Sequence, residues 1–179
     1  DHLPNEVLSE LAECYLVGHL RTPGGDLGFL INELVEIATR ALSSGINDPT
    51  TAGTCIDWLG AGATEISQRA IPSSMRLDDS RRLRVVALPD SFEDYVERSF
   101  GRLRQYVAGD MNAALHLLRT LGEVAESCSG DEQIEALAAE ADRLSTIAEH
   151  KLVGANLVQY QARARQLQRM LVGGATAGM

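Results

Sequence analysis

The chain has 179 residues, of which 45% are hydrophobic, and this suits one ordinary domain, or a core domain with an appended helical hairpin. Its net charge of −9 argues against general nucleic-acid binding, because neutralising phosphates requires a cationic face, and weighs weakly against broad docking onto anionic lipid. No run of about 18 apolar residues and no signal peptide occurs, so we expect no bilayer-spanning segment and no secretion signal.

Two features of composition bear on location. The three cysteines are widely spaced without a CxxC pattern, which predicts buried thiols in a reducing, cytoplasmic compartment. The charge is uneven, because residues 1–150 carry −13 and residues 151–179 carry +4. The sequence also opens at Asp1 and enters helical pattern quickly, which suggests a fragment of a longer protein.

The first helix is predicted from Asn5, as its cap, to about Leu20, and Pro23–Gly25 forms a turn after it. Asp26 is placed to cap a second helix. We expect this helix to be central to the core, and its predicted inward residues are Phe29, Leu30, Leu34, Ile37, Ala38, Ala41 and Leu42.

The second helix is expected to end at Ser43–Gly45. Asp48 is then the predicted N-cap of a third helix, and Pro49 is its first helical residue. The third helix then runs to about Arg69. Its predicted inward residues are Ala52, Cys55, Ile56, Leu59, Ala63 and Ile66. Its glycines at 53, 60 and 62 weaken the helix but permit a close approach by a neighbour.

Residues 74–88 predict a small β-hairpin, since β-branched and apolar residues flank the turn signal Asp78–Ser80. The segment Asp90–Glu93 fits a capping box that opens a helix to about Val107. Its predicted inward residues are Phe92, Val96, Phe100, Leu103 and Val107. Asp110 is expected to start the next helix.

The end of the sequence predicts two long helices, one from Asp131 and one over residues 152–171, which we expect to form an antiparallel hairpin. The fold class is therefore mainly α, a bundle of about seven helices with one β-hairpin near residues 74–88. The expected organisation is a core domain over 1–127, a helical hairpin over 128–172 packed on it, and a disordered tail over 173–179.

Catalytic signatures are missing from the sequence. HEXXH, GxSxG and the Gly-rich phosphate loops do not occur, and the four histidines lack ligand companions at metal-site spacing. We therefore assign no catalytic residue, metal or cofactor, and interpret the histidines as surface or capping side chains.

A polar constellation surrounds the second helix, and it is the best candidate for a ligand site. Its members are Arg21, Thr22, Asp26, Glu36, Arg40, Asn47 and Asp48. The arginines can receive an anion, or the carboxylates can hold a divalent cation through oxygen. The structural interpretation is favoured, because Asp26 and Asp48 suit caps, Glu36 and Arg40 suit a helix pair, and Asn47 suits a tight turn.

The basic last helix allows two interpretations as well. Arg163, Arg165 and Arg169 can face membrane headgroups, nucleic acid or an acidic partner domain. With Lys151 they make only four positive charges, so a solvated face on a helix packed against the acidic body of the same protein is favoured.

The residues around the second helix resemble a family of bacterial predicted membrane proteins that carry a domain of unknown function. The shared order is Arg21-Thr22, Asp26, Phe29, Leu34–Ala38, Arg40–Ser43, Ile46–Pro49 and Thr51-Ala52. The resemblance is clear over residues 15–59 and looser to about residue 124. Gly25, Leu30, Glu36 and Ser44 stand where the family usually has Gln, Gly, Asp and Pro, and the change at Gly25 puts a shared binding role in doubt.

The resemblance implies a longer parent protein in the bacterial inner membrane, with N-terminal transmembrane helices as the partner of this region, which is expected on the cytoplasmic side. Membrane association is expected through the missing segment only, and a homo-oligomer is possible. The leading hypothesis is a helical module that assembles or regulates the membrane portion. The alternative is a sensor of a small ligand or ion, and a carboxylate-based hydrolase is the third hypothesis.

Overall fold

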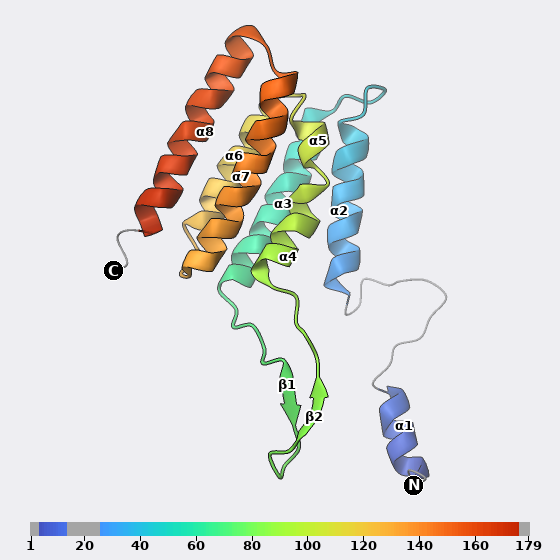
Figure 1. Cartoon of the computed structure of the whole chain (residues 1–179). Coiled ribbons are helices and arrows are strands. Elements are labelled where there is room, and N and C mark those ends of the chain that lie inside the picture. Colours follow the sequence, from blue (N-terminus) through green and yellow to red (C-terminus); the bar gives the residue numbers. More distant parts are fainter. Residues whose placement is uncertain (1–3, 14–25, 176–179) are drawn as a thin grey trace.

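The computed structural model describes residues 4–13 and 26–175, which form a mainly α-helical bundle with a β-hairpin (Figure 1). The helices are α1 (Asn5–Glu13), α2 (Leu27–Ala41), α3 (Pro49–Ser67), α4 (Phe92–Val96), α5 (Arg104–Val107), α6 (Met111–Ala125), α7 (Asp131–Lys151) and α8 (Gly154–Ala175). The hairpin pairs β1 (Met75–Leu77) with β2 (Leu83–Val86). The predicted fold class, with its hairpin at residues 74–88, is confirmed.

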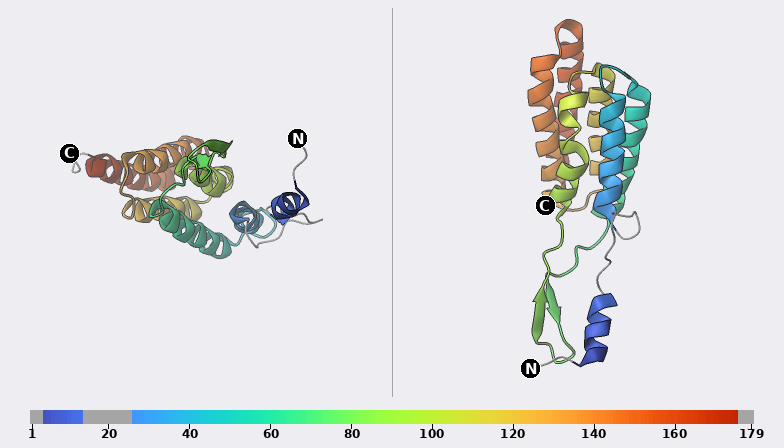
Figure 2. Two further views of the ribbon diagram at one scale, coloured as in Figure 1. Left: turned by 90° about the horizontal axis from the view of Figure 1, so that it is seen from below. Right: turned by 90° about the vertical axis from the view of Figure 1, so that its right-hand side faces the viewer.

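Helices α2–α8 stand side by side, with α2 at one edge of the bundle and α8 at the opposite edge, and α1 lies apart from them (Figures 1 and 2). One hydrophobic core runs through them, and it includes Leu59 of α3, Leu121 of α6, Leu144 of α7 and Tyr160 of α8, all at most 1% exposed. The division into a core domain and a C-terminal hairpin near residue 127 stays a prediction, and the core is continuous across it.

Side-chain caps define where several helices begin. Asp26 accepts a hydrogen bond from the backbone N–H of Phe29 at 2.9 Å, and Asp110 accepts one from Ala113 at 2.8 Å. Asp48 caps α3 with Pro49 in the first turn. These three caps, which satisfy N–H groups that lack a partner within the helix, are confirmed. The predicted stretch from residue 14 to Leu20 lies outside the described residues.

The inward face predicted for α2 is wrong in part. The residues that α2 buries are Ile31, Val35, Ala38 and Ala41. Leu30 is 43% exposed and Ile37 is 46% exposed. Because α2 lies at the edge of the bundle and packs on α3, only one of its two apolar stripes is covered, so it is also not the central helix.

The helix predicted over residues 90–107 is interrupted. A π-helical turn, η1 (Glu97–Gly101), separates α4 from α5, and all five predicted inward residues are nevertheless buried. The capping box lies one residue later than predicted, because Ser91 and Asp94 exchange the reciprocal hydrogen bonds.

Helices α3 and α6 approach each other closely at Gly60. A Cβ atom added at Gly60 would lie 2.3 Å from the Cγ2 atom of Thr120, a separation that real side chains do not reach. The glycine therefore lets the α6 side chain lie directly on the α3 backbone, which confirms the expected role of a small residue here.

α7 and α8 form an antiparallel pair joined by a short turn (Figure 1). Gly154 begins α8 at a φ of +59°, a conformation that glycine adopts without steric cost. The helix extends to Ala175, beyond the predicted end at residue 171. It packs on α6 and α7 through Tyr160 and Leu167, while Arg163, Arg165 and Arg169 are exposed.

Candidate functional site

The structure spreads the predicted ligand residues over the length of α2. Asp26 lies at the N-terminus of this 15-residue helix, and Asp48 lies beyond its C-terminus at the start of α3. A helix of this length is about 22 Å long, so the two carboxylates do not meet. Arg21 and Thr22 lie outside the described residues, and a ligand pocket around α2 stays a prediction.

Asn47 and Asp48 have local roles in the turn between α2 and α3. Asn47 adopts a φ of +49°, in the left-handed region that asparagine tolerates. Asp48 accepts hydrogen bonds of 3.1 Å from the N–H groups of Thr50 and Thr51. The side-chain hydrogen bond from Thr51, with those backbone bonds, lowers the pKa of Asp48 below its usual value.

Glu36 and Arg40 form an ion pair of 2.7 Å on the outer side of α2, with both side chains more than 60% exposed. An exposed pair of this kind, four residues apart on one helix, contributes little to stability. It leaves both charges accessible to solvent.

An apolar stripe lies on the uncovered side of the same helix. Its members are Leu27, Leu30, Leu34 and Ile37, which follow one another at helical spacing, and we call them the α2 stripe. Leu27 is 51% exposed, and Leu34 is partly buried against the core. Isolated exposed apolar residues are common, but Leu27, Leu30 and Ile37 together on one helical face form a surface that suits contact with another apolar surface.

The described residues include a buried ion cluster where η1 and α5 meet α7. The carboxylate of Glu140 on α7 is fully buried and receives two hydrogen bonds of 2.8 Å from Arg104 on α5. Arg104 also bonds Glu97 at 2.6 Å, and Arg143 bonds Glu97 at 3.2 Å. Burial raises the pKa of Glu140, and the hydrogen bonds from Arg104 oppose this rise.

This cluster is structural in character. Its central carboxylate is shielded from solvent, and both oxygens are already occupied by the Arg104 guanidinium. The sequence did not indicate it, because Glu140 reads as a surface residue of a charged helix and its partner lies 36 positions away.

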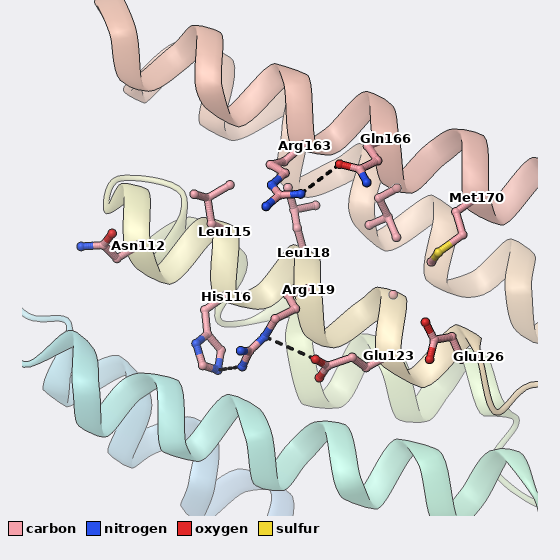
Figure 3. A pocket seen from close by; sticks show the side chains of 12 residues that line it. Asn112, Leu115, His116, Leu118, Arg119, Glu123, Glu126, Arg163, Gln166 and Met170 are labelled. Atoms are coloured by element: carbon pink, nitrogen blue, oxygen red, sulfur yellow. Dashed lines mark hydrogen bonds and ion pairs between the residues drawn. The ribbon is translucent and has the colours of Figure 1, made fainter.

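A groove of about 540 Å³ lies between α6 and α8 (Figure 3). It combines apolar and charged side chains. The lining residues are Asn112, Leu115, His116, Leu118, Arg119, Gly122, Glu123, Glu126, Arg163, Gln166, Leu167 and Met170. Its volume lies in the range of small-molecule sites, and the mixture of apolar walls with a few charges is typical of them.

One side of the groove continues into a polar contact with α3. The Nε2 atom of His116 lies 2.6 Å from a carboxylate oxygen of Asp57, and Arg119 lies 3.3 Å from the same oxygen. Arg119 also pairs with Glu123 at 3.5 Å. Among the described residues, no hydroxyl or thiol side chain hydrogen-bonds to the His116 ring, so the arrangement offers no activated nucleophile.

Neither metal ligands nor reactive thiols gather in the described part of the chain. No group of three or more His, Cys, Asp or Glu side chains there is placed to hold a metal ion. Cys55 is buried and Cys128 half-buried, and burial raises the pKa of both thiols, which makes them poor nucleophiles at neutral pH. Cys14 lies outside the described residues.

The comparisons with known proteins identify a family. The sequence profile of DUF2254, described as a predicted membrane protein, matches residues 2–123. Uncharacterized proteins of Mycobacterium bovis and Mycobacterium tuberculosis are 32% identical to the chain over 112 residues, which are 63% of this chain but only 22% of each relative. No solved structure matches the chain significantly.

The family's description refers to a membrane, although none of the helices in residues 4–13 and 26–175 is both long and apolar enough to cross one. The matched residues include α2, α3, the hairpin and most of α6, and thus the segments that carried the resemblance in the sequence. The chain belongs to the DUF2254 family of predicted membrane proteins.

Proposed function

We propose that this chain is a helical module of a longer, membrane-anchored bacterial protein, and that it assembles or regulates the membrane-embedded portion. The chain spans about a fifth of the length of the relatives that it matches, so most of such a protein lies outside it. The family's description as a predicted membrane protein supports a membrane location for that remainder.

The observation that carries this proposal is the α2 stripe. It lies on an edge helix, covers about three turns, and belongs to the segment that resembles the family most closely. Among the described residues no other helix covers the exposed part of this apolar face, which suits a helix of a partner that would bury it in a helix-to-helix contact. We infer that the membrane portion of the same protein covers the α2 stripe, and that any homo-oligomer forms through that portion.

The proposal places the module on the cytoplasmic side of the inner membrane. Its support is that Cys55 and Cys128 form no disulfide within the part of the chain that the structure describes, which suits a reducing compartment. Accessibility of an introduced surface cysteine to a membrane-impermeant thiol reagent, in intact and in permeabilised cells, tests the side directly. Labelling in intact cells would contradict the assignment.

The proposal is tested with the full-length protein solubilised in detergent. We expect deletion of this module to change the oligomeric state of the membrane portion, measured by light scattering on a sizing column. We expect the substitutions Leu30→Ser and Ile37→Ser together to have the same effect as the deletion, because they remove the exposed stripe and leave the buried face of α2 intact.

The matched control is Val153→Ser with Val158→Ser, which removes two exposed apolar side chains near the start of α8, at the other edge of the bundle. This variant should behave as the wild type. A full-length protein that is strictly monomeric, and whose behaviour is unchanged after deletion of the module, would contradict the proposal.

A ligand sensor is the second candidate function, and the groove between α6 and α8 favours it. Arg163 on α8 and Arg119 on α6 line the groove with Leu115 and Met170, a combination that suits a small organic anion with an apolar part. A thermal-shift screen of such anions tests it. We expect a rise in Tm that Arg163→Ala abolishes and Arg165→Ala retains, and no shift with any anion would exclude this function.

The carboxylate-based hydrolase receives no support from the described residues. Asp26 and Asp48 cap helices, and Glu36 pairs with Arg40 in solvent. A pair of carboxylates for acid–base catalysis would have to share a cleft, which these three side chains do not.

A further inference from the structure

The β-hairpin is the most exposed apolar element of the described structure. It projects beyond the ends of α3 and α4, away from α2 and α5–α8 and at the end of the molecule where α1 also lies (Figures 1 and 2). Every residue of β1 and β2 is exposed, and Leu88, which follows β2, is 85% exposed. A two-stranded hairpin is marginal in water when nothing packs on it, so this one needs a partner surface.

The register divides the hairpin into two unlike faces. Met75 pairs with Val86, and Leu77 pairs with Leu83. Cross-strand partners point to the same side of a sheet. The register shifts by one residue between Arg76 and Leu77, which adds an extra residue to β2 and keeps both pairs on the same side, so these four side chains form one apolar face. Arg76 pairs with Val85 and belongs to the other face.

The hairpin is also a basic element on an acidic protein. Residues 74–88 hold four arginines and two aspartates, a net charge of +2, whereas the whole chain carries −9. Asp78 pairs with Arg84 at 2.8 Å. Arg81 and Arg82, at the tip, have no carboxylate partner among the residues that the structure describes. The tip therefore presents two guanidinium groups that are available to an anion.

We propose that the hairpin docks on an anionic lipid bilayer, with its apolar face at the level of the headgroup and acyl boundary and its arginines on lipid phosphates. This inference rests on the proposed location beside a membrane. Apolar side chains flanked by arginines are the combination that binds such an interface, because burial and attraction to anionic lipid act together.

A second copy of the chain is a poorer occupant. The four side chains of the apolar face are 50–61% exposed, which corresponds to roughly 400 Å² per copy, so pairing two faces would bury about 800 Å², less than stable protein interfaces need. Such pairing would also bring two hairpins of charge +2 together. Phosphate groups instead complement this charge.

The acidic body does not prevent the contact. The extended segment from Ile71 to Asp78 reaches up to about 23 Å from the bundle, and charges separated by more than about 8 Å are largely screened at physiological ionic strength. The hairpin can therefore reach an anionic surface that repels the acidic bundle of α2–α8.

The test uses the purified 179-residue chain with vesicles of phosphatidylcholine alone or with 30% phosphatidylglycerol, separated by flotation. We expect binding to the anionic vesicles only, and weaker binding as salt is added. Arg81→Gln with Arg82→Gln should lower the partition coefficient about 25-fold. Leu77→Ser with Leu83→Ser should lower it on the order of 50-fold. All these side chains are exposed, so circular dichroism should show unchanged helix content.

The matched control is Arg165→Gln with Arg169→Gln on α8, which removes the same charge from exposed positions elsewhere. It should keep wild-type partitioning beyond a small general charge effect. A loss equal to that of the tip variant would move the contact to α8 and overturn the proposal. The proposal would also be overturned if the wild-type chain bound neither kind of vesicle. It would be overturned as well if the chain formed a dimer that the Leu77 and Leu83 substitutions convert to monomer.

This result is separable from that of the proposed function. If the chain does not bind vesicles while substitutions in the α2 stripe still change the oligomeric state of the full-length protein, only the proposed lipid contact is contradicted. If the chain binds anionic vesicles while the α2 stripe has no effect on the full-length protein, only the proposed assembly role fails.

Discussion

Arg104 and Glu140, 36 positions apart in the sequence, meet through two hydrogen bonds of 2.8 Å that join α5 to α7. The carboxylate is fully buried, and the guanidinium is 15% exposed. A buried carboxylate is tolerated only when its charge is matched and both oxygens are satisfied. The pair therefore fixes α5 against α7.

We predict that Arg104→Met destabilises the protein by about 3–5 kcal/mol, because it leaves the Glu140 carboxylate buried without its main partner. Urea denaturation at pH 7, followed by circular dichroism, measures the change. Arg98→Met is the control, since Arg98 forms an exposed pair with Asp90, and its loss should cost about 0–1 kcal/mol. Equal effects of the two substitutions would contradict the assigned burial of Glu140.

Gly60→Ala should destabilise the protein, although alanine is the better helix former. The added methyl group would overlap Thr120 at 2.3 Å and cost about 1–3 kcal/mol by overpacking, against a gain of up to about 1 kcal/mol in helix propensity. Thermal unfolding tests this. Gly45→Ala, where no atom lies within 4 Å of the added Cβ, should leave Tm nearly unchanged. An increase in Tm with Gly60→Ala would show that α3 and α6 lie farther apart at this position than the structure places them.

The cap of α3 should titrate. The pKa of Asp48 is lowered in the folded state, so its contribution to stability is present above the usual value near 3.8 and is lost as the pH falls through the lower folded pKa. Asp48→Asn keeps an acceptor for the cap but does not titrate. We therefore expect the difference in Tm between the wild type and Asp48→Asn to shrink between pH 5 and pH 2.

Two outcomes of the comparison between the wild type and Asp48→Asn would contradict this prediction. A Tm difference that stays constant over this pH range would mean that the charge of Asp48 has no part in the cap. If the wild type instead gained stability relative to Asp48→Asn as the pH falls, the pKa of Asp48 would be raised in the folded protein and not lowered.

Local signals in the sequence were reliable because their physics is local. Asp26, Asp48 and Asp110 act on N–H groups two or three residues away, and each caps the predicted helix. The hairpin also depends on nearby residues and forms where predicted. By contrast, the inward face of α2 could not be predicted, because Leu30 and Ile37 continue one apolar stripe and Ile31 and Val35 the other. Only the neighbours of α2 decide between them.

The contacts between helices were harder to predict, because they depend on residues far away in the sequence. Glu140 and Asp57 find their partners on other helices, at separations of 36 and 59 residues, and no local pattern marks such contacts. The π-turn at Glu97–Gly101 interrupts a helical pattern that is otherwise continuous. The resemblance around α2 identified the family, and the exposed stripe on that helix became visible only in the fold.

Photo-crosslinking in the full-length membrane-bound protein tests the central claim most directly. A photoreactive benzoyl side chain placed at Leu30 or Ile37, both exposed on the α2 stripe, should crosslink to peptides of the membrane-embedded portion identified by mass spectrometry. The same group at Val158 on α8 should not. Absence of crosslinks from both α2 positions, or an identical pattern from Val158, would contradict the account.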